Sequence, residues 1–294
     1  MAPENKKVST YKEAGVDIDL ATELLTRVKK KLASTKRPEM LAPIGGFGGL
    51  FQIDLTKYKK PVFVSSIDGV GTKLMVAALM QKFDTVGHDI VNHMYGNDFD
   101  LVGVINGIVE KDKLITGEKI KPGHVAIGLP SNGLHTNGFS LARQVLFHSC
   151  RYEVDTELAE LNHETIGEAL LKPHTCYWPA IKAAMDIDFP LDGNAHIKGG
   201  GLYDNVTLIL PPDVDAVFHK SMIKNPPPIF RLITEAGNID DSEAYRVFNM
   251  GVGMVWFVPA DAANQALDIC RKAGFDAFIC GEIVKGSKKS IVVD

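Results

Sequence analysis

Hydrophobic and polar positions along the chain fall into two recurring patterns. Apolar residues recur every three or four positions from Leu20 to Leu32, behind Asp19, a residue that can cap a helix. This spacing predicts an amphipathic helix over residues 19–33. Residues 61–67 instead form a run of β-branched and aromatic residues, which is typical of a buried strand.

The two patterns alternate along the rest of the chain. Further helices are predicted over residues 72–81, 85–93, 139–147, 165–170, 178–185, 228–236 and 262–273. Further strands are predicted over 101–109, 125–129, 195–197, 206–210, 252–258 and 277–284. This order predicts an α/β or α+β fold with a mixed sheet and helices in each of two domains. A polar stretch with Gly117, Pro122 and Gly123 separates the domains, which we expect over residues 1–120 and 121–294.

Composition and charge are those of a soluble globular protein. The 294 residues are 45% hydrophobic and 23% charged, and the formal net charge is −4, with a sequence pI of about 6.1. This balance argues against sequence-independent binding of nucleic acid, which needs a basic surface. Residues 27–31 and 36–37 form one local basic cluster, which is either a phosphate-binding patch or the solvated face of a helix.

Cysteine spacing and hydropathy indicate in which cellular compartment the protein is expected. Cys150, Cys176, Cys270 and Cys280 are widely scattered, and no pair has the CxxC spacing of a zinc or redox site. We therefore expect reduced thiols, several of them buried. The sequence shows no apolar signal segment and no uncharged apolar stretch long enough to cross a bilayer. These features predict a cytoplasmic protein without membrane contact.

Two glycine-rich segments in the first half of the chain could approach a phosphate. Residues 45–49 (Gly-Gly-Phe-Gly-Gly) offer backbone N–H groups, but no Walker A lysine follows them. Residues 68–73 (Asp-Gly-Val-Gly-Thr-Lys) lie between a predicted strand and a predicted helix. There Asp68 could bind magnesium and Lys73 could neutralise phosphate charge. The alternatives are a flexible surface loop and a turn with an aspartate cap and an exposed lysine.

Three segments in the second half place polar side chains beside glycines. Residues 196–201 (His-Ile-Lys-Gly-Gly-Gly) join a histidine, which titrates near neutral pH, to glycines that would let a ligand approach the backbone. Residues 131–138 and the following Ser140 are rich in donors and acceptors. Residues 249–254 (Asn-Met-Gly-Val-Gly-Met) place glycines next to an apolar strand. A structural histidine and an ordinary loop before a helix cap are the alternatives for the first two segments.

These segments are more specific together than singly. Residues 11–19 (Tyr-Lys-Glu-Ala-Gly-Val-Asp-Ile-Asp) open the series, which continues in order through residues 45–48, 68–73, 84–87 (Asp-Thr-Val-Gly), 131–140, 196–201 and 249–254. In this order they resemble the motifs of the phosphoribosylformylglycinamidine cyclo-ligases, the aminoimidazole ribonucleotide synthetases of purine biosynthesis. The resemblance covers nearly the whole chain.

The resemblance implies a two-domain ATP-dependent synthetase fold and a C–N bond-forming enzyme. ATP would phosphorylate the formyl-amide oxygen of formylglycinamidine ribonucleotide, because an amide oxygen is a poor leaving group. The amidine nitrogen would then attack the activated carbon and close the imidazole ring. The resemblance also implies Mg²⁺ beside ATP, an ATP-binding first domain, and a homodimer in which the sheets of the first domains join.

Site residues follow from the resemblance position by position. It places His196 and Lys73 in catalysis and Asp68 at the metal. The implied nucleotide-binding residues are Lys29, Gly45, Gly46, Gly48, Gly49, Asp68, Gly69, Gly71 and Thr72. The implied substrate-binding residues are His135, Asn137, Ser140, Gly199 and Gly200.

The sequence departs from the family pattern after residues 84–92. The pattern there continues into a Val-Asn-Asp segment, a strand, a helix and an acidic loop, whereas in this chain Met94 follows His93 directly. By the size of a βαβ element, a unit of roughly 30 residues or more is absent. Its acidic residues resemble metal ligands, for which Asp98 or Asp100 could substitute. We expect its absence to leave the first domain incomplete, with uncovered sheet edges and apolar faces.

Several alternatives stay open. The absent segment either belongs to the molecule and is missing only from the printed sequence, was removed by design, or was lost naturally. The chain could also be another ATP-using relative of the same fold, of the thiamine-phosphate kinase or selenophosphate synthetase type. The joint presence of the 131–140 and 196–201 motifs favours the cyclo-ligase over these. A non-catalytic dimeric relative that has lost its metal site is the second alternative.

Overall fold

The computed structural model describes residues 23, 26, 37–41, 50–89, 93–95, 98–100 and 102–294. The chain divides into two compact units, Met1–Pro61 and Val62–Asp294. None of the described helices has the length and apolar character needed to cross a bilayer. All four cysteines are free, and Cys270 and Cys280 are buried, as expected for reduced thiols.

Local contacts organise the described part of the first unit. Positions 23 and 26 are helical and fall within the helix predicted over residues 19–33. Met40 and Phe51 form an antiparallel bridge. The 3₁₀ helix η2 (Leu55–Lys57) follows Asp54, whose side chain accepts the Thr56 amide and so caps the turn.

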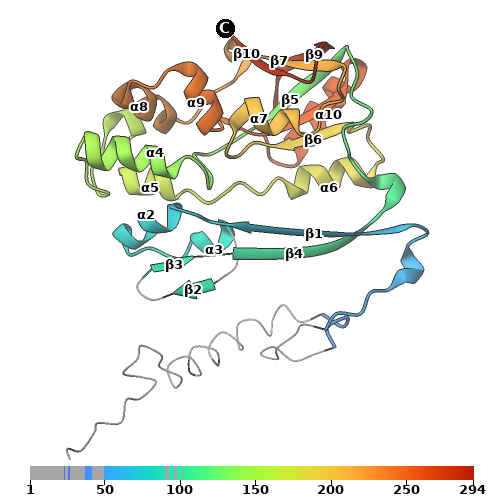
Figure 1. The fold of residues 1–294 in the computed structure, drawn as a ribbon, viewed down its shortest axis with the longest axis horizontal. Helices are drawn as coiled ribbons and strands as arrows, with labels where there is room; N and C mark the ends of the chain where they lie inside the picture. Colours follow the sequence, from blue (N-terminus) through green and yellow to red (C-terminus); the bar gives the residue numbers. More distant parts are fainter. Residues whose placement is uncertain are drawn as a thin grey trace, which may run out of the picture. The chain divides into compact units, whose positions relative to one another are not determined.

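The second unit contains most of the regular structure (Figure 1). Its strands are β1 (Pro61–Gly69), β2 (His93–Tyr95), β3 (Asp98–Asp100), β4 (Val102–Glu110), β5 (His124–Pro130), β6 (Gly193–His196), β7 (Val214–His219), β8 (Val252–Pro259), β9 (Phe278–Lys285) and β10 (Ser290–Val293). Its α-helices are α2 (Lys73–Met80), α3 (Val86–Asp89), α4 (Phe139–Arg143), α5 (Ile166–Leu171), α6 (Trp178–Asp186), α7 (Gly201–Thr207), α8 (Pro228–Gly237), α9 (Asp241–Val247) and α10 (Ala263–Lys272). A π-helix, η4 (Gln144–Ser149), continues α4, and short 3₁₀ helices are η3 (Lys111–Lys113), η5 (Ala159–Leu161), η6 (Lys220–Met222) and η7 (Ala260–Ala262).

Six strands of this unit form one mixed sheet in the order β10-β7-β9-β5-β8-β6. Strand β10 runs parallel to β7, and the other neighbouring pairs are antiparallel. Strands β1 and β4 form a separate two-stranded sheet, and β2 and β3 form an antiparallel pair. The mixed α/β fold predicted from the sequence is confirmed.

Strand β8 explains why residues 252–258 are almost uniformly apolar. Val255 and Phe257 face a core cluster that contains residues of α7, whereas Trp256 and Val258 face a cluster that contains residues of α6 and α10. Helices therefore cover both faces of the sheet, and a strand buried on both faces loses the alternation of polar and apolar residues.

A third cluster joins α2 to helices far along the chain. Leu74 and Ala77 of α2 pack with Phe139 of α4, Leu170 of α5 and Phe230 of α8. This packing fixes the segment that follows β1 beside the loops that precede α4 and follow α5. The domain boundary expected at residues 120 and 121 stays a prediction.

Two element predictions are corrected by the structure. Residues 206–210 are not a strand, because Val206 belongs to α7 and a turn follows. Leu202, Val206 and Leu210 recur every four positions and are all buried, which is the spacing of a helix face. Of the helix predicted over residues 85–93, the structure describes α3 (Val86–Asp89), and His93 belongs to β2 instead.

The two-stranded sheet exposes large apolar side chains. Phe63 and Ile67 of β1 are 62% and 69% exposed, and Ile105 of β4 is 72% exposed. Such a surface agrees with the expectation that the absent segment leaves apolar faces uncovered.

Candidate functional site

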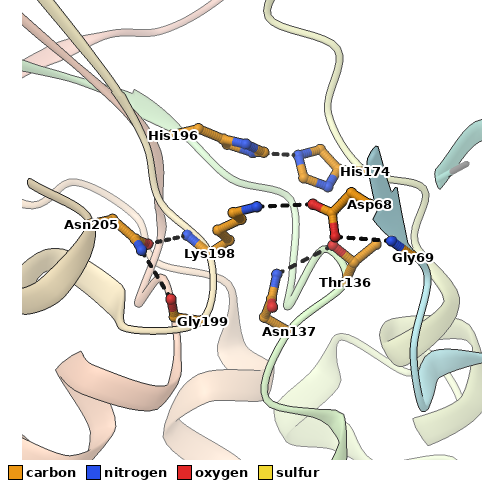
Figure 2. A network of polar contacts seen from close by, with 9 residues as sticks. All are labelled: Asp68, Gly69, Thr136, Asn137, His174, His196, Lys198, Gly199 and Asn205. Atoms are coloured by element: carbon orange, nitrogen blue, oxygen red, sulfur yellow. Dashed lines mark hydrogen bonds and ion pairs between the residues drawn. The ribbon is translucent and has the colours of Figure 1, made fainter. Parts of the chain in front are cut away.

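An ion pair joins the end of β1 to the loop after β6. The Lys198 ammonium lies 2.9 Å from Oδ2 of Asp68, and the Gly69 amide donates to Oδ1 of Asp68 at 2.9 Å (Figure 2). Two motifs that lie 130 positions apart in the sequence thus meet. Burial opposes the ionisation of Asp68, but the hydrogen bonds from Lys198 and Gly69 outweigh it and lower the pKa of the carboxyl group. Asp68 is therefore a carboxylate at neutral pH.

Three histidines gather beside this ion pair. Nε2 of His174 lies 2.8 Å from Nε2 of His196 at the end of β6 (Figure 2). The ring of His135 stacks on that of His174, with 4.1 Å between ring centroids. His135 is buried, His174 is half-buried and His196 is exposed. The loop before α4, the segment after α5 and strand β6 each contribute one imidazole.

Burial and neighbouring charge keep these imidazoles neutral. Burial lowers the pKa of His135 to about 2 and that of His174 to about 4, and nearby cationic groups add to both shifts. The pKa of His196 is also lowered, by desolvation and then by Lys198, with Asp68 acting in the opposite direction. A neutral imidazole can accept a proton or bind a metal ion.

The triple-glycine segment is held by one asparagine. Oδ1 of Asn205 accepts the Lys198 amide at 2.6 Å, and Nδ2 of Asn205 donates to the Gly199 carbonyl at 2.9 Å (Figure 2). Gly200 and Gly201 have φ values of 103° and 55°, in the left-handed region that favours glycine. The Cβ of a residue at position 199 would lie 3.1 Å from Oδ1 of Asn137, so the two predicted substrate segments are adjacent.

Other motif residues anchor the loop that carries His135. Ser131 donates to Oδ1 of Asn249 at 2.7 Å, and Nδ2 of Asn249 donates to the Gly133 carbonyl at 2.9 Å. Ser131 and Asn249 are both buried, so these two polar side chains support the loop through hydrogen bonds inside the protein.

The hydroxyl groups of Thr72 and Ser140 lie 3.3 Å apart. Thr72 belongs to the predicted nucleotide segment, whereas Ser140 belongs to the predicted substrate segment. Their contact brings these two sets of residues together at the start of α2 and α4.

Lys73 is located away from solvent. Its Nζ lies 2.7 Å from Oδ2 of Asp89, neither side chain is exposed, and it also donates to the Lys172 carbonyl at 2.8 Å. Burial lowers the pKa of Lys73, and the charge of Asp89 opposes this shift. Oδ1 of Asp89 accepts the amide of His174 at 2.7 Å. In this arrangement the buried pair holds the segment that carries His174, and the Lys73 ammonium is closed to solvent.

Comparisons with known proteins identify the family. Residues 121–294 match the model of the AIR synthase related protein, C-terminal domain. The phosphoribosylformylglycinamidine cyclo-ligase of Syntrophotalea carbinolica is 38% identical, over 97% of this chain and 97% of its own length. That of Geotalea uraniireducens is 36% identical, over 94% of this chain and 95% of its own length. The chain belongs to the phosphoribosylformylglycinamidine cyclo-ligase family.

Solved structures of lower sequence identity share the fold of this cyclo-ligase family member. Thiamine-monophosphate kinase from Stenotrophomonas maltophilia superposes with a TM-score of 0.59 and 12% identity, over 92% of this chain and 95% of that chain. HypE from E. coli superposes with a TM-score of 0.55 and 13% identity, over 93% of this chain and 94% of that chain. At such identities the likeness concerns the fold alone.

The alignment with the cyclo-ligase of S. carbinolica is longer than this chain. It spans 345 residues, 51 more than the 294 present here, so at least 51 aligned positions have no counterpart in this chain. The relative therefore contains a substantial stretch that this chain lacks. Its location between His93 and Met94, which here lie together in β2, stays a prediction.

The predicted site residues of this cyclo-ligase family member fall into three groups. Those that meet around the Asp68–Lys198 ion pair or in the adjoining loops are Asp68, Gly69, Gly71, Thr72, His135, Asn137, Ser140, His196, Gly199 and Gly200. Lys73 is buried next to them. Lys29, Gly45, Gly46, Gly48 and Gly49 lie outside the described residues.

Sequence reasoning missed two residues of the group. Lys198 lies inside the His-Ile-Lys-Gly-Gly-Gly segment, and its place between a histidine and three glycines was a usable signal. His174 lies in an irregular segment after α5, with no glycine or repeated pattern near it, so only the folded chain places it beside His196.

Proposed function

We propose that this chain closes the imidazole ring of aminoimidazole ribonucleotide from formylglycinamidine ribonucleotide, with ATP as the phosphoryl donor. The observation that carries the proposal is the meeting of Asp68, Lys198 and His196 in a chain of the cyclo-ligase family. Phosphorylation of the formyl-amide oxygen makes it a good leaving group. The amidine nitrogen then forms the new C–N bond, and phosphate departs with the oxygen.

His196 is suited to accept the proton that the attacking nitrogen loses. Its imidazole is neutral because desolvation and Lys198 lower its pKa, and it lies on the exposed side of the histidine group. A Cβ at Gly199 would lie 3.1 Å from Oδ1 of Asn137, so the glycine segment adjoins the loop of Asn137. We assign His135, Asn137, Ser140, Gly199 and Gly200 to the substrate side.

Asp68 fits the role of a magnesium ligand beside ATP. Magnesium is commonly held by one or two carboxylates together with substrate phosphates, and Asp68 is an ionised, half-exposed carboxylate. The bound ion would offset charge on the phosphates. Gly69, Gly71 and Thr72 adjoin Asp68 and belong with Lys29 and residues 45–49 on the proposed nucleotide side. The buried Lys73 supports this region through Asp89.

The proposal includes a cytoplasmic homodimer. Family resemblance implies that the first domains' sheets join, and the exposed side chains of Phe63, Ile67 and Ile105 give β1 and β4 a surface that a second copy could cover. The two-domain division at residues 120 and 121 belongs to the same proposal.

The test is ADP release that depends on formylglycinamidine ribonucleotide. The chain should release ADP with this substrate, and His196→Gln should lower kcat by about 10²–10⁴-fold. His148→Gln, which changes an exposed histidine of η4, should leave kcat unchanged. Release of ADP with thiamine phosphate instead would favour the kinase alternative. ATP binding without turnover would favour a non-catalytic relative.

If no ADP is released, the mass of the intact protein shows how to interpret that result. A mass well above 32.0 kDa would place the absent segment in the molecule. An inactive chain of 32.0 kDa would connect the loss of activity to the lost acidic segment.

A further inference from the structure

The side chains of His135, His174 and His196 bring three ring nitrogens close together, each of which could bind a metal ion. Their ligand atoms, one from each side chain, all lie within 4.8 Å of one another. Three separate segments supply them, so the grouping is a product of the fold. Of the described His, Cys, Asp and Glu residues, these three form the group with the spacing of a metal centre. Three histidines with an open fourth position are a known ligand set for zinc.

One buried ring nitrogen of the group lacks a hydrogen-bond partner, and two others contact each other. Nδ1 of His135 is buried without a hydrogen-bond partner, an arrangement that destabilises a polar atom unless a ligand satisfies it. Nε2 of His135 lies 3.2 Å from the Thr175 hydroxyl. A metal-binding histidine typically uses one nitrogen for the ion and the other for such an outer contact. Nε2 of His174 and Nε2 of His196 also face each other at 2.8 Å, an arrangement that needs a shared proton or a cation.

Two ammonium groups near this point repel a cation, and their carboxylate partners reduce that repulsion. Lys198 is paired with Asp68 and Lys73 with Asp89, so each of these ammonium groups has a carboxylate partner. The imidazoles are uncharged at neutral pH, which is the form that binds metal. The rings of His135 and His174 are stacked at 26°, so one of them must rotate about χ2 for both to reach one ion.

We propose that His135, His174 and His196 form a site for a divalent transition-metal cation of the zinc type. Imidazole nitrogens favour zinc, cobalt, nickel and copper over magnesium, which prefers oxygen ligands. This site therefore differs in chemistry from the proposed magnesium position at Asp68. Because His196 belongs to both, an ion bound here would compete with the proposed proton transfer, and zinc would inhibit the ring closure.

Cobalt(II) absorption tests the site directly. Titration of the full, metal-stripped chain with Co²⁺ should give visible bands of nitrogen-coordinated cobalt that saturate at one ion per chain. Zn²⁺ should remove them and Mg²⁺ should not. His174→Gln should weaken Co²⁺ binding by about 100-fold or more, because loss of even an outer contact costs 10–100-fold. His148→Gln should leave binding unchanged, since His148 is an exposed histidine outside the group.

Three results would overturn the assignment. They are a folded wild-type chain without these bands, equal binding by His174→Gln and the wild type, and a near-ultraviolet thiolate-to-cobalt band pointing to the exposed Cys176. Circular dichroism checks folding of each variant. If His174→Gln does not fold, His196→Gln changes an exposed ligand of the same set and decides the question. The readout needs no turnover, so it is independent of the proposed ring closure.

Discussion

The side chains of Lys73 and Asp89 form an ion pair that is closed to solvent. Two charges buried together are stable only as a pair, because removal of one partner leaves the other without compensation. The pair also carries the segment with His174, through the Lys172 carbonyl and the His174 amide. A lysine in a motif that resembles a nucleotide site is thus paired with a carboxylate in the interior of the folded chain.

Lys73→Met should lower the free energy of unfolding by about 3–5 kcal/mol, because it leaves the buried carboxylate of Asp89 without a charge partner. Adding Asp89→Leu should recover part of that loss. Urea denaturation measures both. Lys182→Met is the control: Lys182 and Asp186 form an exposed pair one helical turn apart, worth about 0.5 kcal/mol at most. Equal losses at the two sites would contradict a buried, obligate pair.

His135 should make stability depend on pH. Its pKa is about 2 in the folded chain and 6.5 as the ordinary value, so below pH 6.5 the unfolded chain binds a proton that the folded chain does not. Stability is therefore lost as the pH falls below 6.5, by about 1.4 kcal/mol per pH unit for this group. Unfolding free energies at pH 7, 6 and 5 should show a smaller slope in His135→Asn. The same slope in this variant and the wild type would exclude His135 as the source.

At the scale of single residues, the sequence predicted some members of the candidate site and missed others. Asp68, His196 and the glycines stood out because motif and residue type are visible along the chain. The burial of Lys73 was not visible, since it depends on Asp89 of α3 and on the segment after α5. His174 was missed for the same reason, because its partner lies 22 positions away.

Helix α7 shows why the strand predicted over residues 206–210 was wrong. Residues 206–210 have a composition typical of strands, yet the two left-handed glycines at positions 200 and 201 turn the chain into a helix. The buried residues then recur every four positions. Strand β7 was missed although Val214, Ala216 and Phe218 alternate with more exposed residues, a period of two that short strands show clearly. The long apolar run of β8 was predicted because burial on both faces leaves few polar residues.

Gly201→Ala should destabilise the chain by about 3 kcal/mol or more. Its φ is 55°, and an added Cβ would lie 1.9 Å from the Tyr245 carbonyl oxygen, a backbone atom that cannot move freely. Gly274→Ala separates the two causes, because Gly274 has a φ of 91° and open space around its Cβ. There only backbone strain remains, about 1–2 kcal/mol. Thermal unfolding compares them, and equal shifts would rule out the steric contact as the larger cause.

The described part of the chain combines a well-packed six-stranded sheet with a two-stranded sheet that has exposed apolar side chains. The six-stranded sheet has a core on both faces, while β1 and β4 present large apolar side chains to solvent. A surface of this kind usually meets another surface. The alignment, longer than the chain by 51 residues, indicates that relatives contain additional structure.

Ile67→Glu combined with Ile105→Glu should convert the proposed dimer into a monomer, since two charges would be buried at the contact. Sedimentation velocity measures the change. Leu208→Glu is the control, because Leu208 is 76% exposed and follows α7, away from β1 and β4 in the sequence. A wild-type chain that sediments as a monomer, or a doubly substituted chain that remains a dimer, would contradict the proposed contact.

The hydrogen bond from the His174 amide to Asp89 should slow the exchange of that amide hydrogen with solvent. Amides in irregular segments usually exchange with solvent quickly, but this one donates to a carboxylate with no exposed surface. Its deuterium uptake therefore requires the hydrogen bond to the Asp89 carboxylate to break. The exchange rate of one loop amide would thus report how often the support beneath the three histidines comes apart, in a chain that is otherwise folded.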